Sequence, residues 1–190
     1  LANCQVQLGL LDEAIGNYEK VLVKAPNHLE AINNLGNTWQ DMQEPEKAVP
    51  YHKQALELEP RYQLAMLSLA EAYKNQDKQQ GAIDLLLKAN EIEPHSDIFQ
   101  SLGVNYQQIG DMASAKECYL QAIAFNPLAG KAYRGYAEVY KIKTEEDLVV
   151  IRQAEKQLDS MEDLDHWSFA MGNGFDSIGD YQQAIRYYEQ

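Results

Sequence analysis

The fold is decided by residues 34–60, which read NLGNTWQDMQEPEKAVPYHKQALELEP, because the key residues of this stretch return at a fixed interval. Its last residue belongs to a series of prolines at positions 26, 60, 94 and 127, with steps of 34, 34 and 33. Internal similarity with a period in this range is typical of stacked helical hairpins. The sequence therefore predicts a helical repeat protein, which offers an extended surface and seldom a catalytic pocket of its own.

Two further series run in step with the prolines. A small residue recurs at Ala2, Gly36, Ala70, Gly103, Ala137 and Gly172. An aromatic residue follows three positions later in five of the six copies, as Trp39, Tyr73, Tyr106, Tyr140 and Phe175. Two helices approach closely only where the crossing side chains are small, and an aromatic three residues on fills the adjoining space on the same face. Both series therefore predict tightly packed helix pairs.

The repeating motif resembles the tetratricopeptide repeat family. The resemblance is carried by residues 34–39 with Ala48, Ala55 and Pro60, and again by residues 101–106 with Gly110, Asp111, Ala115, Tyr119, Ala122 and Pro127. It covers essentially the whole chain. It implies an all-α fold, an α-solenoid in which antiparallel helix hairpins form a right-handed superhelix.

The repeats predict one solenoid over residues 1–190. Its expected parts are a partial repeat at 1–26, repeats at 27–60, 61–94, 95–127 and 128–162, and a partial repeat at 163–190. Repeat five is the loosest: after a first helix over 128–141, Thr144 and the acidic residues behind it predict the N-cap of a second helix that ends near Leu158. Both chain ends fall inside a repeat and would leave stacking faces uncovered, which favours self-association through the terminal repeats.

The composition of the chain argues against several classes of function. The chain of 190 residues has a net charge of −13, from 29 acidic and 16 basic residues. This balance argues against a nucleic-acid-binding protein, which needs a basic face. No apolar run reaches the roughly 18 residues of a membrane span. Cys4 and Cys118 lie in different repeats, which predicts packing residues rather than a disulfide and favours a cytoplasmic location.

Motifs for catalysis and metal binding are missing from the sequence. Its four histidines have no metal-ligand spacing, and no paired Cys-x-x-Cys occurs. A phosphate loop and the Gly-x-Ser-x-Gly motif are also absent. The sequence therefore predicts no enzyme, no metal site and no cofactor.

By the resemblance, the first helix of each hairpin lines the concave side, and ligand contacts come from first-helix positions outside the packing seam. The expected contact residues are Asn33, Asn37, Gln40, Leu67, Glu71, Lys74, Gln100, Val104, Gln107, Lys131, Arg134 and Phe169. Amides dominate the middle of this set. Because Asn and Gln both donate and accept hydrogen bonds, a row of them suits the backbone of an extended peptide.

Interpretations that involve no ligand also remain open for these residues. The amides can equally be uncharged, solvated helix surface. The basic residues Lys131, Arg134 and Lys141 can either meet an acidic partner or balance Glu138 and the acidic residues from Glu145 onward. One subclass of the family binds the C-terminal carboxylate of chaperone tails through basic residues. Its pattern is not matched, because Asn33, Ser68 and Asp97 stand at or near the clamp positions.

The sequence thus predicts a non-catalytic protein-interaction scaffold that binds a peptide or protein segment on its concave surface. One alternative remains. Residues 167–184 resemble the last repeat of bacterial tetratricopeptide proteins that continue into a sulfotransferase domain. In that interpretation the chain is the recruiting or dimerising arm of a larger enzyme, whose catalytic domain lies beyond residue 190.

Overall fold

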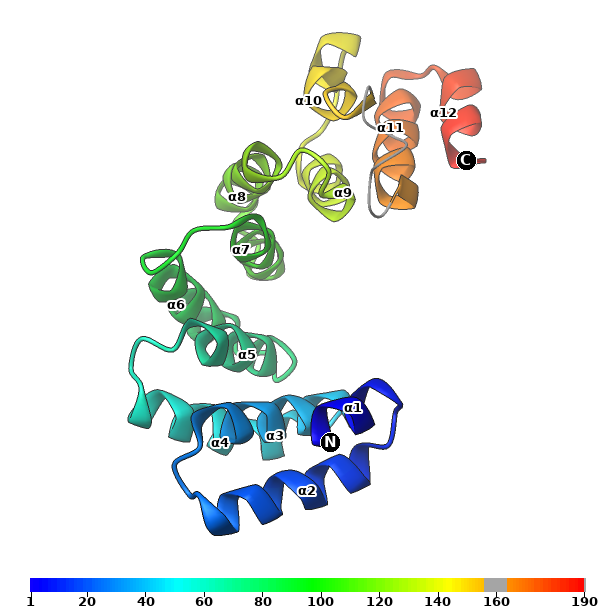
Figure 1. Cartoon of the computed structure of the whole chain (residues 1–190). Helices are drawn as coiled ribbons and strands as arrows, with labels where there is room; N and C mark the ends of the chain where they lie inside the picture. The colour runs from blue at the N-terminus through cyan, green and yellow to red at the C-terminus, as the bar shows by residue number, and fades with distance from the viewer. Residues whose placement is uncertain (156–163, 190) are drawn as a thin grey trace. The chain divides into compact units, whose positions relative to one another are not determined.

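The computed structural model describes residues 1–155 and 164–189, and all regular secondary structure within them is helical (Figure 1). The chain divides into two compact units, residues 1–94 (unit 1) and residues 95–190 (unit 2).

Unit 1 consists of helix hairpins that pack on one another in chain order. The hairpins are α1 (Ala2–Gln7) with α2 (Leu11–Lys24), α3 (Leu29–Asp41) with α4 (Pro45–Leu58), and α5 (Gln63–Lys74) with α6 (Gln79–Asn90). Between hairpins, α2 lies against α3 and α4 lies against α5. Small residues allow this close approach, since Ala55 of α4 and Ala65 of α5 enclose Ile32 with no exposed surface on any of the three. In a solenoid, each repeat packs only against the repeats before and after it, and the hairpins of unit 1 follow this pattern.

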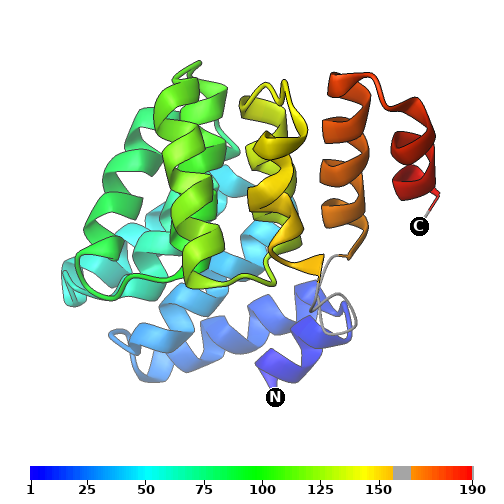
Figure 2. The ribbon, with the colours of Figure 1, turned by 90° about the horizontal axis from the view of Figure 1, so that it is seen from above.

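Unit 2 repeats the arrangement. Its elements are α7 (Ser96–Gln108) with α8 (Met112–Phe125), α9 (Gly130–Val139) followed by the 3-10 helix η1 (Glu145–Leu148) and α10 (Val149–Arg152), and α11 (Leu164–Ile178) with α12 (Tyr181–Tyr188). Helix α9 packs against both α8 and α11, and Figure 2 shows α11 and α12 as an antiparallel pair. The largest fully buried side chains of its core are Trp167, Tyr119 and Tyr133.

The turns follow the period found in the sequence. Pro26, Pro60, Pro94 and Pro127 each lie between the second helix of one hairpin and the first helix of the next. Inside the hairpins the turn uses left-handed backbone, with φ of 74° at Gly9, 83° at Gly110 and 85° at Gly179. Two non-glycine residues occupy the equivalent place, Gln43 at 61° and Asp77 at 56°.

Repeat five departs from the expected hairpin. Thr144 is the N-cap of η1 and acidic residues fill the first turn, as predicted. The cap is made by Asp147, whose carboxylate accepts hydrogen bonds from the backbone N–H groups of Lys143 (2.9 Å) and Thr144 (3.0 Å). These bonds, that from Lys143 first, hold the pKa of Asp147 below its ordinary value. The predicted helix to Leu158 is corrected, because α10 ends at Arg152. Leu158 itself and the expected repeat boundary at 162/163 lie outside the described residues.

Candidate functional site

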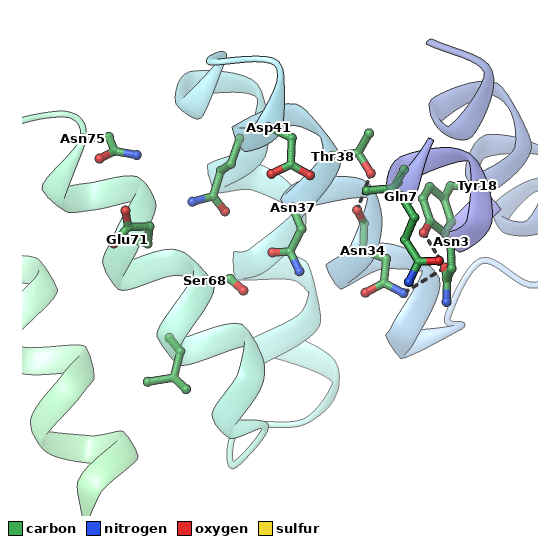
Figure 3. Close-up of a pocket in the computed structure, with 13 residues that line it drawn as sticks. Asn3, Gln7, Tyr18, Asn34, Asn37, Thr38, Asp41, Ser68, Glu71 and Asn75 are labelled. Atoms are coloured by element: carbon green, nitrogen blue, oxygen red, sulfur yellow. Dashed lines mark hydrogen bonds between the residues drawn. The ribbon is translucent and has the colours of Figure 1, made fainter. Parts of the chain in front are cut away.

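The first helices of unit 1 surround a hollow of about 710 Å³, called the unit-1 hollow below (Figure 3). Its lining comes from α1, α3 and α5, with one tyrosine from α2. The lining residues are Asn3, Val6, Gln7, Tyr18, Asn34, Asn37, Thr38, Gln40, Asp41, Leu67, Ser68, Glu71 and Asn75. Figure 3 shows Asn37 and Asp41 of α3 opposite Ser68, Glu71 and Asn75 at α5. Amides and hydroxyls outnumber the other side-chain types, so the surface can make many directed hydrogen bonds.

Four of the expected contact residues lie in this lining: Asn37, Gln40, Leu67 and Glu71. Lys74 does not line the hollow, and its ammonium pairs with Glu71 at 2.5 Å. Asn33 requires a correction. Its side chain is only 2% exposed and faces α4, so it is not available to a ligand.

His52 of α4 explains the burial of Asn33. The fully buried ring has Nδ1 at 3.0 Å from Asn33 Oδ1 and Nε2 at 2.7 Å from Gln40 Oε1. A Cβ atom on Gly36 would come within 2.6 Å of this ring, so only glycine lets the ring reach the concave side of α3. The ring thereby holds Gln40 at the wall of the hollow.

The protonation of His52 determines how these amides are oriented. Burial lowers the pKa of His52 to about 4, so the ring is neutral at pH 7 and carries one N–H. One of the two amides must then accept a hydrogen bond from the ring and the other must donate one to it. Because an amide can turn either its oxygen or its nitrogen toward the ring, the ring tautomer decides which of the two Gln40 turns toward the hollow.

Two neighbouring amides at the other end of the hollow are already engaged with each other. The Tyr18 hydroxyl donates to Asn3 Oδ1 at 2.5 Å, and Asn34 Nδ2 donates to the same oxygen at 3.5 Å. Asn37 differs, since no residue in the described ranges is hydrogen-bonded to its side chain. Asn37 is therefore an amide of α3 whose oxygen and nitrogen are both free to bind a ligand.

Unit 2 has a second hollow of about 380 Å³, called the unit-2 hollow below. Its lining residues are Gln100, Val104, Gln107, Gln108, Tyr119, Lys131, Arg134, Gly135 and Glu138. All five expected contact residues of α7 and α9 are among them. Phe169, the last expected residue, lies beside this surface, with the Arg134 guanidinium 4.5 Å from its ring centroid.

Tyr119 of α8 has in unit 2 the place that His52 has in unit 1. Its hydroxyl donates to Gln107 Oε1 at 2.8 Å, and the Gln107 amide donates in turn to Glu138 Oε2 at 3.3 Å. The same Glu138 accepts from Arg134 Nε at 3.0 Å. Arg134 is thus balanced within the protein, which supports the balancing interpretation of this basic residue over the acidic-partner one.

Sequence reasoning missed His52 and Tyr119 as supports of the concave surface. A signal for them exists. Each ring lies sixteen residues after a glycine of the small-residue series, and twelve residues after a glutamine that lines a hollow. Reading the second helices at this interval would have connected Gly36 with His52 and Gly103 with Tyr119.

Within residues 1–155 and 164–189, no group of three or more His, Cys, Asp or Glu side chains is placed to hold a metal ion. Among the helices of the described residues, none is long and apolar enough to cross a membrane.

Family models described as tetratricopeptide repeat match the chain at three places, residues 28–58, 96–127 and 168–190. The first two matches coincide with the hairpins α3–α4 and α7–α8, and the third covers most of α11 and all of α12.

Curated relatives share parts of the chain. Protein CTR9 homolog of Arabidopsis thaliana is 28% identical over 129 residues, which are 65% of this chain and 12% of that protein. Tetratricopeptide repeat protein 8 of Caenorhabditis elegans is 25% identical over 130 residues, 67% of this chain and 26% of its own. Sperm-associated antigen 1 of Mus musculus is 34% identical over 90 residues, which are 47% of this chain and 10% of that protein. The chain thus spans about a quarter or less of the length of these relatives.

Solved structures match over nearly the whole chain. The pilF protein of Pseudomonas aeruginosa has a TM-score of 0.81 at 22% identity, covering 98% of this chain and 85% of its own. MamA has a TM-score of 0.70 at 24% identity, covering 100% and 95%. YrrB, described as a TPR protein with an unusual peptide-binding site, has a TM-score of 0.64 at 17% identity, covering 90% and 88%. At these identities the likeness concerns the fold, and it confirms the predicted class of an all-α hairpin solenoid.

Proposed function

The chain belongs to the tetratricopeptide repeat proteins, and on that premise we propose that it is a protein-interaction scaffold whose unit-1 hollow binds an extended peptide segment. The observation that carries the proposal is the arrangement of Asn37 and Gln40 in that hollow. An extended peptide exposes alternating N–H and C=O groups, and an amide side chain can satisfy either.

Preorganisation supports the same conclusion. His52 already holds Gln40 in place through a 2.7 Å hydrogen bond, so little side-chain entropy is lost when a peptide binds there. Leu67 adds an apolar contact on the opposite helix, which suits an aliphatic peptide side chain. The hollow thus combines a fixed amide, an accessible amide and an apolar wall.

The unit-2 hollow is proposed as a second contact surface of the same kind. Tyr119 fixes the oxygen of Gln107, so the amide nitrogen is the group that remains for Glu138 and for a ligand. Gln100 and Val104 complete this surface on α7. The alternative of an arm of a sulfotransferase-type enzyme has no support among the relatives named above, none of which is a sulfotransferase by name.

The experiment is selection of a random peptide display library on the whole chain, followed by affinity measurement with a labelled selected peptide. Replacing the accessible amide, Asn37→Ala, should weaken binding roughly fivefold to tenfold, the effect of about one lost hydrogen bond. Gln54→Ala is the matched control, because Gln54 is an exposed amide on α4 outside both hollows. The proposal fails if no peptide is enriched, or if Asn37→Ala binds every selected peptide as tightly as the unchanged protein.

A further inference from the structure

The unit-1 hollow carries negative charge without a cation of its own. Its lining contains the carboxylates of Asp41 and Glu71 and no Lys, Arg or His. Glu71 is compensated by Lys74 at 2.5 Å. Asp41 differs, because none of the salt bridges or hydrogen bonds among the described residues involves its side chain. One uncompensated carboxylate therefore faces the proposed peptide site.

The position of Asp41 adds to this charge. It is the last residue of α3, a helix with no basic residue in its last turn. The carbonyl groups at a helix C-terminus carry a partial negative charge, so an acidic side chain there disfavours folding. Helix α5 also ends at the hollow, since its C-cap residue Asn75 is part of the lining. Asp41 thus stands where local helix energetics disfavour it, and residues of this kind are expected at functional sites.

A positively charged group would relieve this repulsion. Partial desolvation raises the pKa of Asp41 above its ordinary value, although the residue is exposed, so the charged form is less favoured here than in water. A metal ion is not favoured, because no group of three or more metal-ligating acids, histidines or cysteines is found in the described parts of the chain. An organic cation with an aliphatic stem fits better, since Val6 and Leu67 also line the hollow and can cover such a stem.

We propose that the peptide bound in the unit-1 hollow carries a lysine or arginine side chain, whose cation pairs with Asp41. This inference rests on the proposed function and specifies its ligand. The aliphatic part of the side chain lies against Leu67 or Val6, and the amides Asn37 and Gln40 bond the peptide backbone beside it.

The test uses the same random peptide library, selected in parallel on the unchanged chain and on Asp41→Asn. Peptides selected on the unchanged chain should share a Lys or Arg at one position. Asp41→Asn, and separately replacement of that Lys by norleucine or that Arg by citrulline, should each weaken binding roughly threefold to tenfold. Combining both changes should weaken it little further, because they remove the same ion pair.

A matched control separates this ion pair from the general attraction of an acidic protein for basic peptides. Glu57→Gln removes one charge at an exposed position next to the last residue of α4, outside the hollow, and should leave the affinity unchanged. Asp41→Asn should also raise the midpoint of thermal unfolding of the free protein while it weakens binding, a combination that general damage to the fold would not produce.

The outcomes distinguish the two proposals. If peptides are selected and depend on Asn37 but show no basic residue and no effect of Asp41→Asn, the inference about the cation is overturned and the peptide-binding function stands. If Glu57→Gln weakens binding as much as Asp41→Asn, non-specific charge attraction explains the result and the inference is likewise overturned. If no peptide is enriched, both proposals fall.

Discussion

His52 connects the outer helix of a hairpin with its concave surface. The buried ring passes Gly36, bonds the buried Asn33 on one side and reaches Gln40 at the wall of the hollow on the other. A tyrosine in the same place, such as Tyr119 in α8, offers one hydroxyl to one glutamine. The histidine links two amides and adds a group that titrates.

This titration predicts that stability depends on pH through His52. The pKa is 6.5 for the ordinary side chain and about 4 in the folded protein, so the unfolded chain takes up the proton first as the pH falls. The neutral His52 ring contributes fully to the free energy of unfolding above pH 6.5, and this contribution is lost as the pH falls from 6.5 to 4. At pH 5 the expected loss is about 2 kcal/mol. Urea unfolding at pH 7 and pH 5 should show this loss for the unchanged protein. For the variant His52→Tyr, the decrease in the free energy of unfolding between pH 7 and pH 5 should be about 2 kcal/mol smaller. Equal decreases in the two proteins would show that His52 is not the titrating group.

At the scale of helices, the ring of Tyr119 is the point where three helices meet. It lies between Gly103 of α7 and Gly135 of α9, and an added Cβ at Gly103 would come within 2.7 Å of the ring, while one at Gly135 would come closer still. Tyr119 is only 2% exposed, and its ring approaches both helices closely. The spacing of α7, α8 and α9 therefore depends on two glycines.

We predict that Gly135→Ala destabilises the protein by roughly 1–3 kcal/mol, because overpacking outweighs the better helix propensity of alanine. The same substitution at Gly16 in α2 is the matched control. A Cβ there meets no atom within 4 Å, so Gly16→Ala should stabilise the helix by roughly 0.5–1 kcal/mol. Chemical denaturation of both variants measures the difference. A result of the same sign for both would show that packing around Tyr119 does not control the crossing.

The elements that could be predicted from sequence are those whose geometry requires particular residues. Close helix crossings need small residues and the turns within hairpins need left-handed backbone, so these positions recur and mark the hairpins. A contact made at the end of α10 could not be predicted, because it involves a residue distant in sequence. The Trp167 indole donates to the Ile151 carbonyl at 2.7 Å, one residue before α10 ends at Arg152.

The site was predictable to the level of helix faces and not to the level of single side chains. The period placed Asn37, Gln40, Gln100 and Gln107 on first helices that line the two hollows. It could not show that Asn33 points inward, because that orientation depends on a histidine at a position where other second helices carry tyrosine or leucine. Which of these residues binds a ligand stays a prediction.

At the scale of the whole molecule, three hydrophobic clusters and two hollows each belong to a single unit. The core that includes Tyr119 and Trp167 lies entirely within unit 2, and the clusters around Leu35 and Ile32 lie entirely within unit 1. Each hollow is likewise lined by residues of one unit. The single solenoid over residues 1–190 and its self-association through terminal repeats stay predictions.

We therefore predict that residues 1–94 fold alone, with helical circular dichroism, a cooperative urea transition and the peptide affinity of the whole chain. A chain of this length can bury a sufficient core, and solenoid stability comes from each repeat and its neighbours. Residues 1–77 serve as the control, because this cut removes α6 and with it the Gln63 amide bonds to the carbonyls of Ala89 (2.9 Å) and Glu93 (2.7 Å). The shorter fragment should unfold at lower urea. If residues 1–94 fold but bind the selected peptide more than about tenfold more weakly than the whole chain, the unit-1 hollow is not a complete site.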